Sequence, residues 1–207
     1  MIKISTSILN AQNRIECTKK LNQTNNDYLH IDVMDGKFVP NKQFSIEEIN
    51  ELKNISSKPA DIHLMVEDPI YYIDNISPEN INNITFHIEV NKDINNIIKI
   101  IKEKNIKVGL AIKPKTDINT IIPYLDNIDI ALIMSVEPGF GGQKFIPESL
   151  NRIKQIKNFK NSIITEVDGG VNDTNIDEIK LNTDIAVVGS YIVNTEDYQK
   201  AINTLKN

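Results

Sequence analysis

The segment Tyr28-Leu-His-Ile-Asp-Val-Met34 is short and mostly apolar, with β-branched residues near its centre, which is typical of a buried β-strand. Seven further runs of this kind recur along the chain, and stretches with helical spacing lie between them. In one such stretch, Ile94–Glu103, the isoleucines form a single apolar stripe, and residues 152–157 follow the same pattern. Strands that are apolar nearly throughout predict a parallel sheet covered by helices. The seven other strand runs are Lys3–Leu9, Asp61–Val66, Ile84–Val90, Lys107–Ile112, Ile128–Val136, Ile163–Val167 and Ile185–Val188.

Two architectures fit eight alternations of strand and helix in 207 residues: a closed barrel and an open doubly wound sheet. An open sheet that binds a dinucleotide would have the pattern Gly-x-Gly-x-x-Gly after its first strand. Here the first strand run leads into Ser7-Ile-Leu-Asn10, without a glycine. No linker, repeat or low-complexity segment divides the chain. We therefore predict one α/β domain over residues 1–207, a single (β/α)8 TIM barrel.

The composition is that of an ordinary globular protein, with 40% hydrophobic and 25% charged residues and a formal net charge of -5. No basic stretch is interleaved with aromatic residues, so we expect no nucleic-acid partner. We expect no membrane association, because there is no signal peptide and no apolar run approaches the roughly 20 residues that span a bilayer. Cys17 is the only cysteine, which excludes an internal disulfide and a cysteine-based metal site. These features predict a cytoplasmic protein.

The histidines of the chain all lie within strand runs and close to carboxylates. His30 and Asp32 alternate in one run, and Asp61 and His63 alternate in the next. Alternate residues of a strand point to the same face. In a barrel, inward-facing residues near the carboxyl ends of the strands converge on one mouth, where the active sites of this fold are found. We therefore expect these side chains to meet.

Two later strand runs add polar side chains, His87 with Glu89 and Glu166 with Asp168. Polar groups that are buried without partners are costly, so their presence needs an explanation. Two imidazoles and two carboxylates suit a divalent ion such as zinc or iron, and thiolates are absent. The alternative is that each histidine is a hydrogen-bonded core residue. For His87, which has no metal-site spacing of its own, we prefer that interpretation.

Glycine-containing turns follow the last three strand runs, at Gly139-Phe-Gly-Gly142, Gly169-Gly170 and Gly189-Ser190. Glycine lets backbone N–H groups approach an anion closely, and a following helix N-terminus adds a favourable field. A single glycine turn would mean only a tight turn. Three at one end of a barrel predict a phosphate cradle, which this fold often builds from its last loops.

These residues resemble the ribulose-phosphate 3-epimerase family, in order along almost the entire chain. The blocks at 30–41 and 133–145 are highly specific, whereas residues 188–190 alone would be weak. The chain departs from the family pattern at Thr6, where proline is usual, and at Asn10, where serine is common. The matching segments are Ser7-Ile-Leu9, His30-Ile-Asp-Val-Met-Asp-Gly-Lys-Phe-Val-Pro-Asn41, Asp61-Ile-His-Leu-Met65, Phe86-His-Ile-Glu89, Gly109-Leu-Ala-Ile-Lys-Pro114, Ile133-Met-Ser-Val-Glu-Pro-Gly-Phe-Gly-Gly-Gln-Lys-Phe145, Glu166-Val-Asp-Gly-Gly-Val171 and Val188-Gly-Ser190.

The resemblance implies an enzyme with one divalent metal ion, Zn²⁺ or Fe²⁺ in the first place and otherwise Mn²⁺ or Co²⁺. It also implies a homo-oligomer and an acid–base pair formed by Asp32 and Asp168. The implied metal ligands are His30, Asp32, His63 and Asp168. The implied wall of the reaction centre is Met34, Met65 and Met134, although a strand methionine taken alone is usually core. The implied substrate-binding residues are Ser7, His63, Gly139, Phe140, Gly141, Gly142, Gly169, Gly170, Gly189 and Ser190.

The function that follows is interconversion of D-ribulose 5-phosphate and D-xylulose 5-phosphate in the pentose phosphate pathway. One aspartate would remove the proton at carbon 3 and the other would return one to the opposite face, while the metal stabilises the enediolate. Two alternatives remain: an epimerase for a longer ketose phosphate such as allulose 6-phosphate, and a non-catalytic sugar-phosphate or metal-binding barrel. A sugar-phosphate decarboxylase or aldol-type synthase is disfavoured, because Asp61-Ile-His-Leu-Met-Val66 lacks the lysine and second aspartate of their Asp-x-Lys-x-x-Asp pattern.

Overall fold

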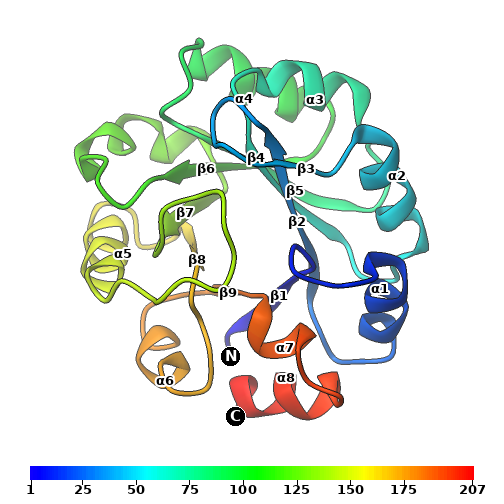
Figure 1. The fold of residues 1–207 in the computed structure, drawn as a ribbon. Helices are drawn as coiled ribbons and strands as arrows, with labels where there is room; N and C mark the ends of the chain where they lie inside the picture. The colour runs from blue at the N-terminus through cyan, green and yellow to red at the C-terminus, as the bar shows by residue number, and fades with distance from the viewer.

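The computed structural model describes residues 1–207 and shows a closed barrel of parallel strands surrounded by helices (Figure 1). The barrel closes because β1 pairs in parallel with both β2 and β9, so the predicted (β/α)8 TIM barrel is confirmed. The barrel strands are β1 (Lys3–Ser7), β2 (Tyr28–Asp35), β4 (Ala60–Met65), β5 (Ile81–His87), β6 (Lys107–Ile112), β7 (Ile130–Met134), β8 (Ile164–Asp168) and β9 (Ile185–Val188).

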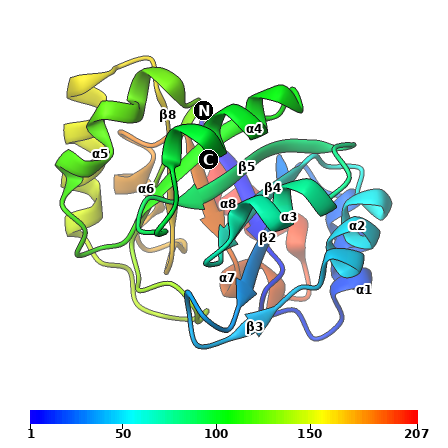
Figure 2. The same ribbon diagram turned by 90° about the horizontal axis from the view of Figure 1, so that it is seen from above.

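A short additional strand, β3 (Lys42–Gln43), was not expected from the sequence. It pairs antiparallel with the end of β2, at Met34 and Asp35, and so extends the sheet beyond the barrel. In Figure 2 the two chain termini lie at the end of the barrel opposite β3 and α7. The carboxyl ends of the barrel strands therefore lie at the β3 end.

Four of the α-helices that cover the barrel begin at a side-chain cap. The side chain of Ser45 accepts a hydrogen bond from Glu48 N at the start of α2, and Asp93 accepts from Asn95 N and Asn96 N at the start of α4. Between β6 and β7 two 3-10 helices, η1 (Ile118–Thr120) and η2 (Ile122–Asn127), replace a regular α-helix. The α-helices are α1 (Arg14–Asn22), α2 (Ile46–Ile55), α3 (Pro69–Asn75), α4 (Ile94–Glu103), α5 (Glu148–Phe159), α6 (Ile176–Ile179), α7 (Ser190–Val193) and α8 (Tyr198–Lys206).

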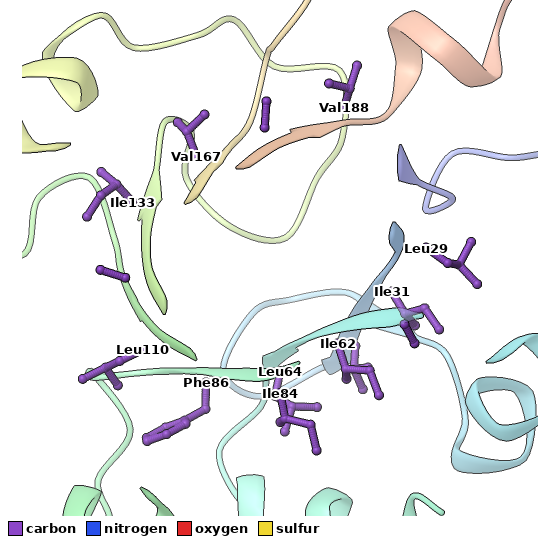
Figure 3. Close-up of a cluster of buried hydrophobic side chains, with 14 of the residues drawn as sticks. Leu29, Ile31, Ile62, Leu64, Ile84, Phe86, Leu110, Ile133, Val167 and Val188 are labelled. Carbon is purple, nitrogen blue, oxygen red and sulfur yellow. The ribbon is translucent and has the colours of Figure 1, made fainter. Parts of the chain in front are cut away.

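The main hydrophobic core lies between the barrel strands and the helices. Every second strand residue contributes to it, and Figure 3 shows Ile31, Ile62, Leu64 and Phe86 among the buried side chains of this cluster. The residues between them, such as His63, belong to the other face of the strands. The alternation that the sequence predicted therefore separates an apolar exterior from a polar barrel interior.

The barrel interior is closed at its amino-terminal end by a small apolar cluster of Tyr28, Ile130 and Ile185, against which Ile164 packs. The polar residues of the barrel interior come later in their strands and therefore lie nearer the carboxyl-terminal mouth. Strand register then fixes their neighbours: Asp32 lies opposite His63, Met34 opposite Met65, and Met134 opposite Asp168.

Several predicted strand boundaries are wrong by one to three residues, and one of these differences bears on the site. The run Ile84–Val90 was expected to include Glu89, but β5 ends at His87. Ile88 N still donates to Ala111 O of β6, and Val90 N then donates back to His87 O, so the chain turns out of the sheet after Ile88. Glu89 therefore lies in the turn beyond β5, from which it reaches back to His87.

Candidate active site

Four side chains from three strands converge at the mouth of the barrel. The potential ligand atoms of His30, Asp32, His63 and Asp168 all lie within 4.8 Å of one another. Asp32 Oδ1 is 3.2 Å from His30 Nε2 and 3.2 Å from His63 Nδ1, and Asp168 Oδ2 is 3.4 Å from His63 Nδ1. Strands β2, β4 and β8 thus bring together the four residues that the sequence analysis singled out as metal ligands.

Behind His30, the carboxylate of Asp61 defines which imidazole nitrogen carries a proton. Asp61 Oδ2 accepts from Ser5 Oγ at 2.6 Å and lies 2.7 Å from His30 Nδ1, while Asp61 Oδ1 accepts from Asn83 Nδ2 at 2.6 Å. Burial alone would raise the pKa of Asp61, but the charge and hydrogen bond of His30 hold it below its usual range. Asp61 is therefore an acceptor only, and His30 donates to it through Nδ1.

The remaining nitrogen of His30 then faces an oxygen of Asp32. A bare imidazole lone pair beside a carboxylate oxygen is repulsive unless a proton or a metal cation lies between them. Without a cation, protons occupy these positions: although burial lowers the pKa of His30, the charges of Asp61 and Asp32 raise it well above its ordinary value. Two imidazoles and two carboxylates around one point are a donor set that suits zinc or iron.

His63 has a second buried histidine behind it. Its Nε2 is 2.9 Å from Nε2 of His87, and Nδ1 of His87 is 3.1 Å from Oε2 of Glu89. The other oxygen of Glu89 accepts from Lys113 N at 2.8 Å and from the hydroxyl of Thr116. Burial raises the pKa of Glu89, yet the hydrogen bond from His87 and the other donors lower it to about 2. Burial lowers the pKa of His87 to about 4, so His87 is a neutral, hydrogen-bonded core residue, the interpretation we preferred.

Glu166, which the sequence placed in a polar strand position, lies deeper in the barrel. It forms a second group of potential ligands with His30 and Asp61, again within 4.8 Å of one another. Neither of its carboxyl oxygens has a hydrogen-bond partner, and burial together with the nearby charge of Asp61 raises its pKa well above the ordinary value. Asp61 already accepts hydrogen bonds from Ser5, His30 and Asn83. We therefore assign Asp61 to the support of His30 and not to the binding of a second ion.

A pocket of about 360 Å³ opens above the four clustered residues. Asp32 and Asp168 form part of its lining, whereas His30 and His63 lie beneath it and do not line it. No lysine or arginine lines the pocket. The predicted residues that do line it are Ser7, Asp32, Met34, Met65, Met134, Gly139, Phe140, Gly141, Gly142, Asp168, Gly169, Gly170, Gly189 and Ser190.

Free backbone donors concentrate on the glycine side of this pocket. The N–H groups of Gly141, Gly142 and Gly170 donate no hydrogen bond within the protein. Gly170 has a φ of 67°, and a Cβ at this position would lie 2.4 Å from the backbone nitrogen of Phe145, so only glycine fits. No basic side chain lines the pocket, so an anion there would be bound by neutral donors, and these N–H groups are among them.

Sequence reasoning missed four polar or aromatic residues that line the pocket, namely Asn10, Gln143, Asn172 and Tyr191. Asn10 Nδ2 donates to Ser190 Oγ at 3.0 Å and thereby ties the first loop of the barrel to the last. Gln143 Nε2 donates to the carbonyl groups of Glu137 and Phe140 and so braces the turn that contains Gly139 to Gly142. Gln143 falls inside the block 133–145, so its position in that block was an available signal.

Comparison with known proteins agrees with this geometry. The model of the ribulose-phosphate 3 epimerase family matches residues 3–193. The ribulose-phosphate 3-epimerase of Helicobacter pylori strain J99 is 37% identical over 212 residues, covering 100% of this chain and 97% of that protein. The ribulose-phosphate 3-epimerase of Bacillus subtilis strain 168 is 36% identical over 217 residues, covering 100% and 99%.

Solved structures share the fold at low sequence identity. KGPDC from Streptococcus mutans superposes with a TM-score of 0.74 at 13% identity and covers 100% of this chain and 96% of its own. The 3-hexulose-6-phosphate synthase from Salmonella typhimurium gives a TM-score of 0.72 at 17% identity, with coverage of 99% of this chain and 96% of its own.

None of the helices combines the length and the apolar character that a membrane crossing needs.

Proposed function

Because the chain belongs to the ribulose-phosphate 3-epimerase family, and is thus an isomerase acting on carbohydrates, we propose that it interconverts D-ribulose 5-phosphate and D-xylulose 5-phosphate. This reaction belongs to the pentose phosphate pathway. The observation that carries the proposal is the convergence of Asp32 and Asp168 with two imidazoles beneath a glycine-lined pocket.

The chain offers a site for one divalent cation. His30 would bind it through Nε2 and His63 through Nδ1, together with oxygens of Asp32 and Asp168. The donor set favours Zn²⁺ or Fe²⁺ and also accepts Mn²⁺ or Co²⁺. When bound, a divalent cation supplies positive charge that stabilises the negative oxygens of an enediolate, a contribution of several kcal/mol in enzymes of this kind.

The two aspartates supply the proton transfers. Epimerisation removes a proton from carbon 3 of the ketose and returns one to the opposite face, so it needs an acceptor on one side and a donor on the other. Asp32 on β2 and Asp168 on β8 both line the pocket. While one is ionised and takes the proton, the other is protonated and gives one, and the roles exchange in the reverse direction.

The rest of the pocket holds the substrate and excludes water. The free N–H groups of Gly141, Gly142 and Gly170 would bind the phosphate, and the reacting carbon would then lie near the two aspartates. Met34, Met65 and Met134 are buried around the carboxylates, and their soft apolar side chains would keep water from protonating the intermediate.

The test is an assay of metal-loaded protein on D-ribulose 5-phosphate, with D-xylulose 5-phosphate detected as the product and bound metal measured in the same sample. We expect turnover with one equivalent of divalent metal, and loss of turnover after treatment with a chelator. Parallel kinetics on allulose 6-phosphate distinguish the pentose enzyme from an epimerase for longer sugars. Binding of ribulose 5-phosphate without turnover by the metal-loaded protein would mean that the barrel is a sugar-phosphate binder and not an epimerase.

A further inference from the structure

We propose that His87 and Glu89 are positioning residues of the metal site, which hold His63 in the tautomer that directs a free Nδ1 lone pair at the cation. The inference rests on the proposed function, because it takes His63 to be a metal ligand. It gives a role to two residues that lie outside the pocket and touch neither the substrate space nor the other ligands.

The three side chains form a continuous hydrogen-bonded series. His63 and His87 are both fully buried, their ring planes are inclined by only 24°, and their centroids lie 5.0 Å apart, so the Nε2 edges of the two rings face each other. Their Nε2 atoms are 2.9 Å apart, and the series continues from Nδ1 of His87 to Oε2 of Glu89 over 3.1 Å. It therefore leads from the cation site on β4, through β5, to the turn that follows β5.

Glu89, the acceptor at the end of the series, determines which ring nitrogen of each histidine carries a proton. Oε1 of Glu89 accepts from Lys113 N and from Thr116, so Glu89 is held as an acceptor and Nδ1 of His87 must donate to it. A neutral imidazole has one N–H, so Nε2 of His87 is an acceptor and accepts a hydrogen bond from the N–H at Nε2 of His63. His63 in turn has its lone pair on Nδ1, the atom 3.2 Å from Asp32 Oδ1 and 3.4 Å from Asp168 Oδ2.

The two imidazoles of the site are thus supported in different ways. His30 donates directly to a carboxylate, Asp61, over 2.7 Å. His63 has no carboxylate next to its Nε2. Instead, His87 lies between His63 and the carboxylate of Glu89 and links the two by hydrogen bonds. An outer partner that fixes the tautomer and orientation of a ligating histidine is a recurring feature of metal sites, and its removal commonly weakens metal binding. If position 87 served only for packing, an apolar side chain would fill it at a lower free-energy cost, because a buried imidazole is costly unless it is hydrogen-bonded.

The decisive experiment compares two substitutions of His87. His87→Gln keeps an acceptor near the position of Nε2, whereas His87→Leu fills the space without one. We expect His87→Leu to lower Zn²⁺ affinity, measured by competition with a chromophoric chelator, by roughly 10- to 100-fold, and His87→Gln to retain most of it. The visible spectrum of Co²⁺-loaded protein should change in His87→Leu, because a misoriented His63 alters the geometry around the cobalt.

Ile84→Val is the matched control, since Ile84 is buried on β5 three residues before His87 and packs in the hydrophobic core on the outer face of the barrel. Its Zn²⁺ affinity should equal that of the parent protein. Equal affinity and an unchanged Co²⁺ spectrum in His87→Leu would overturn the role of His87, and so would an equal loss in all three variants. A parent protein that binds neither Zn²⁺ nor Co²⁺ would instead overturn the metal site of the proposed function and this inference with it.

A measurement on the unmutated protein does not depend on how the variants fold. Long-range ¹H–¹⁵N correlation spectra of the Zn²⁺-loaded protein distinguish imidazole tautomers from their nitrogen shifts. We expect His63 with its proton on Nε2 and His87 with its proton on Nδ1. A proton on Nε2 of His87 would show that the series runs in the opposite direction and would overturn the inference.

Discussion

The hydroxyl of Ser7 donates a hydrogen bond to Oδ2 of Asp32 over 2.7 Å, while Oδ1 of the same carboxylate faces His30 and His63. Each oxygen of Asp32 therefore has its own partners, and the plane of the carboxylate is fixed at the pocket lining. We predict that Ser7→Ala lowers kcat by roughly tenfold, the equivalent of one hydrogen bond to a charged group, and leaves the bound metal at the parent level. Steady-state kinetics and elemental analysis measure both quantities. A variant with unchanged kcat would show that Ser7 does not orient Asp32.

Asn substitutions separate the two proposed proton-transfer groups. Asp32→Asn and Asp168→Asn each remove an acid–base group while keeping its shape, so each should lower turnover by roughly 10²- to 10⁴-fold. In D₂O, at least one of them should also stop exchange of the carbon-3 hydrogen of the substrate with solvent. Bound metal is measured alongside, because both residues are proposed ligands. Normal turnover in either variant would refute the two-aspartate scheme.

The layout of the barrel was predictable because each strand has a simple pattern. In β2 the alternation of His30 and Asp32 with Leu29 and Ile31 already separates an inner from an outer face. Parallel strands that end at one mouth then bring the polar residues together, whichever strands they come from. This is why a cluster of residues as far apart in the sequence as His30 and Asp168 was expected.

The support behind His63 was not predictable, because it depends on the register between strands. The pairing of β4 with β5 shifts at Ala60 and Asp61, and this irregularity sets how far His87 lies beyond His63. No residue pattern specifies such a shift. The same applies to Glu89, which reaches His87 only because the chain turns directly after β5.

The anion-binding side of the pocket is testable at Ser190. Its side chain lies at the pocket lining and accepts a hydrogen bond from Asn10. We predict that Ser190→Asp raises the KM for ribulose 5-phosphate by tenfold or more, at roughly 1.4 kcal/mol per factor of ten, because a carboxylate would face the substrate phosphate. Ser190→Asn is the neutral control and should change KM much less. Equal KM values for both variants would place the phosphate elsewhere.

The last prediction concerns stability at a site remote from the pocket. Oδ2 of Asp184 accepts from Lys157 Nζ at 2.6 Å and from Thr165 N at 2.8 Å. Burial raises the pKa of Asp184, but these donors lower it below its ordinary 3.8. A lowered pKa in the folded state contributes stability above pH 3.8 that is lost as the pH falls further. Asp184→Asn should therefore reduce the free energy of unfolding at pH 7 by about 1 kcal/mol, and less at pH 3. Urea denaturation at both pH values measures this, with Asp126→Asn as control, because its side chain is 93% exposed. An equal loss at both pH values would show that the charge of Asp184 contributes nothing.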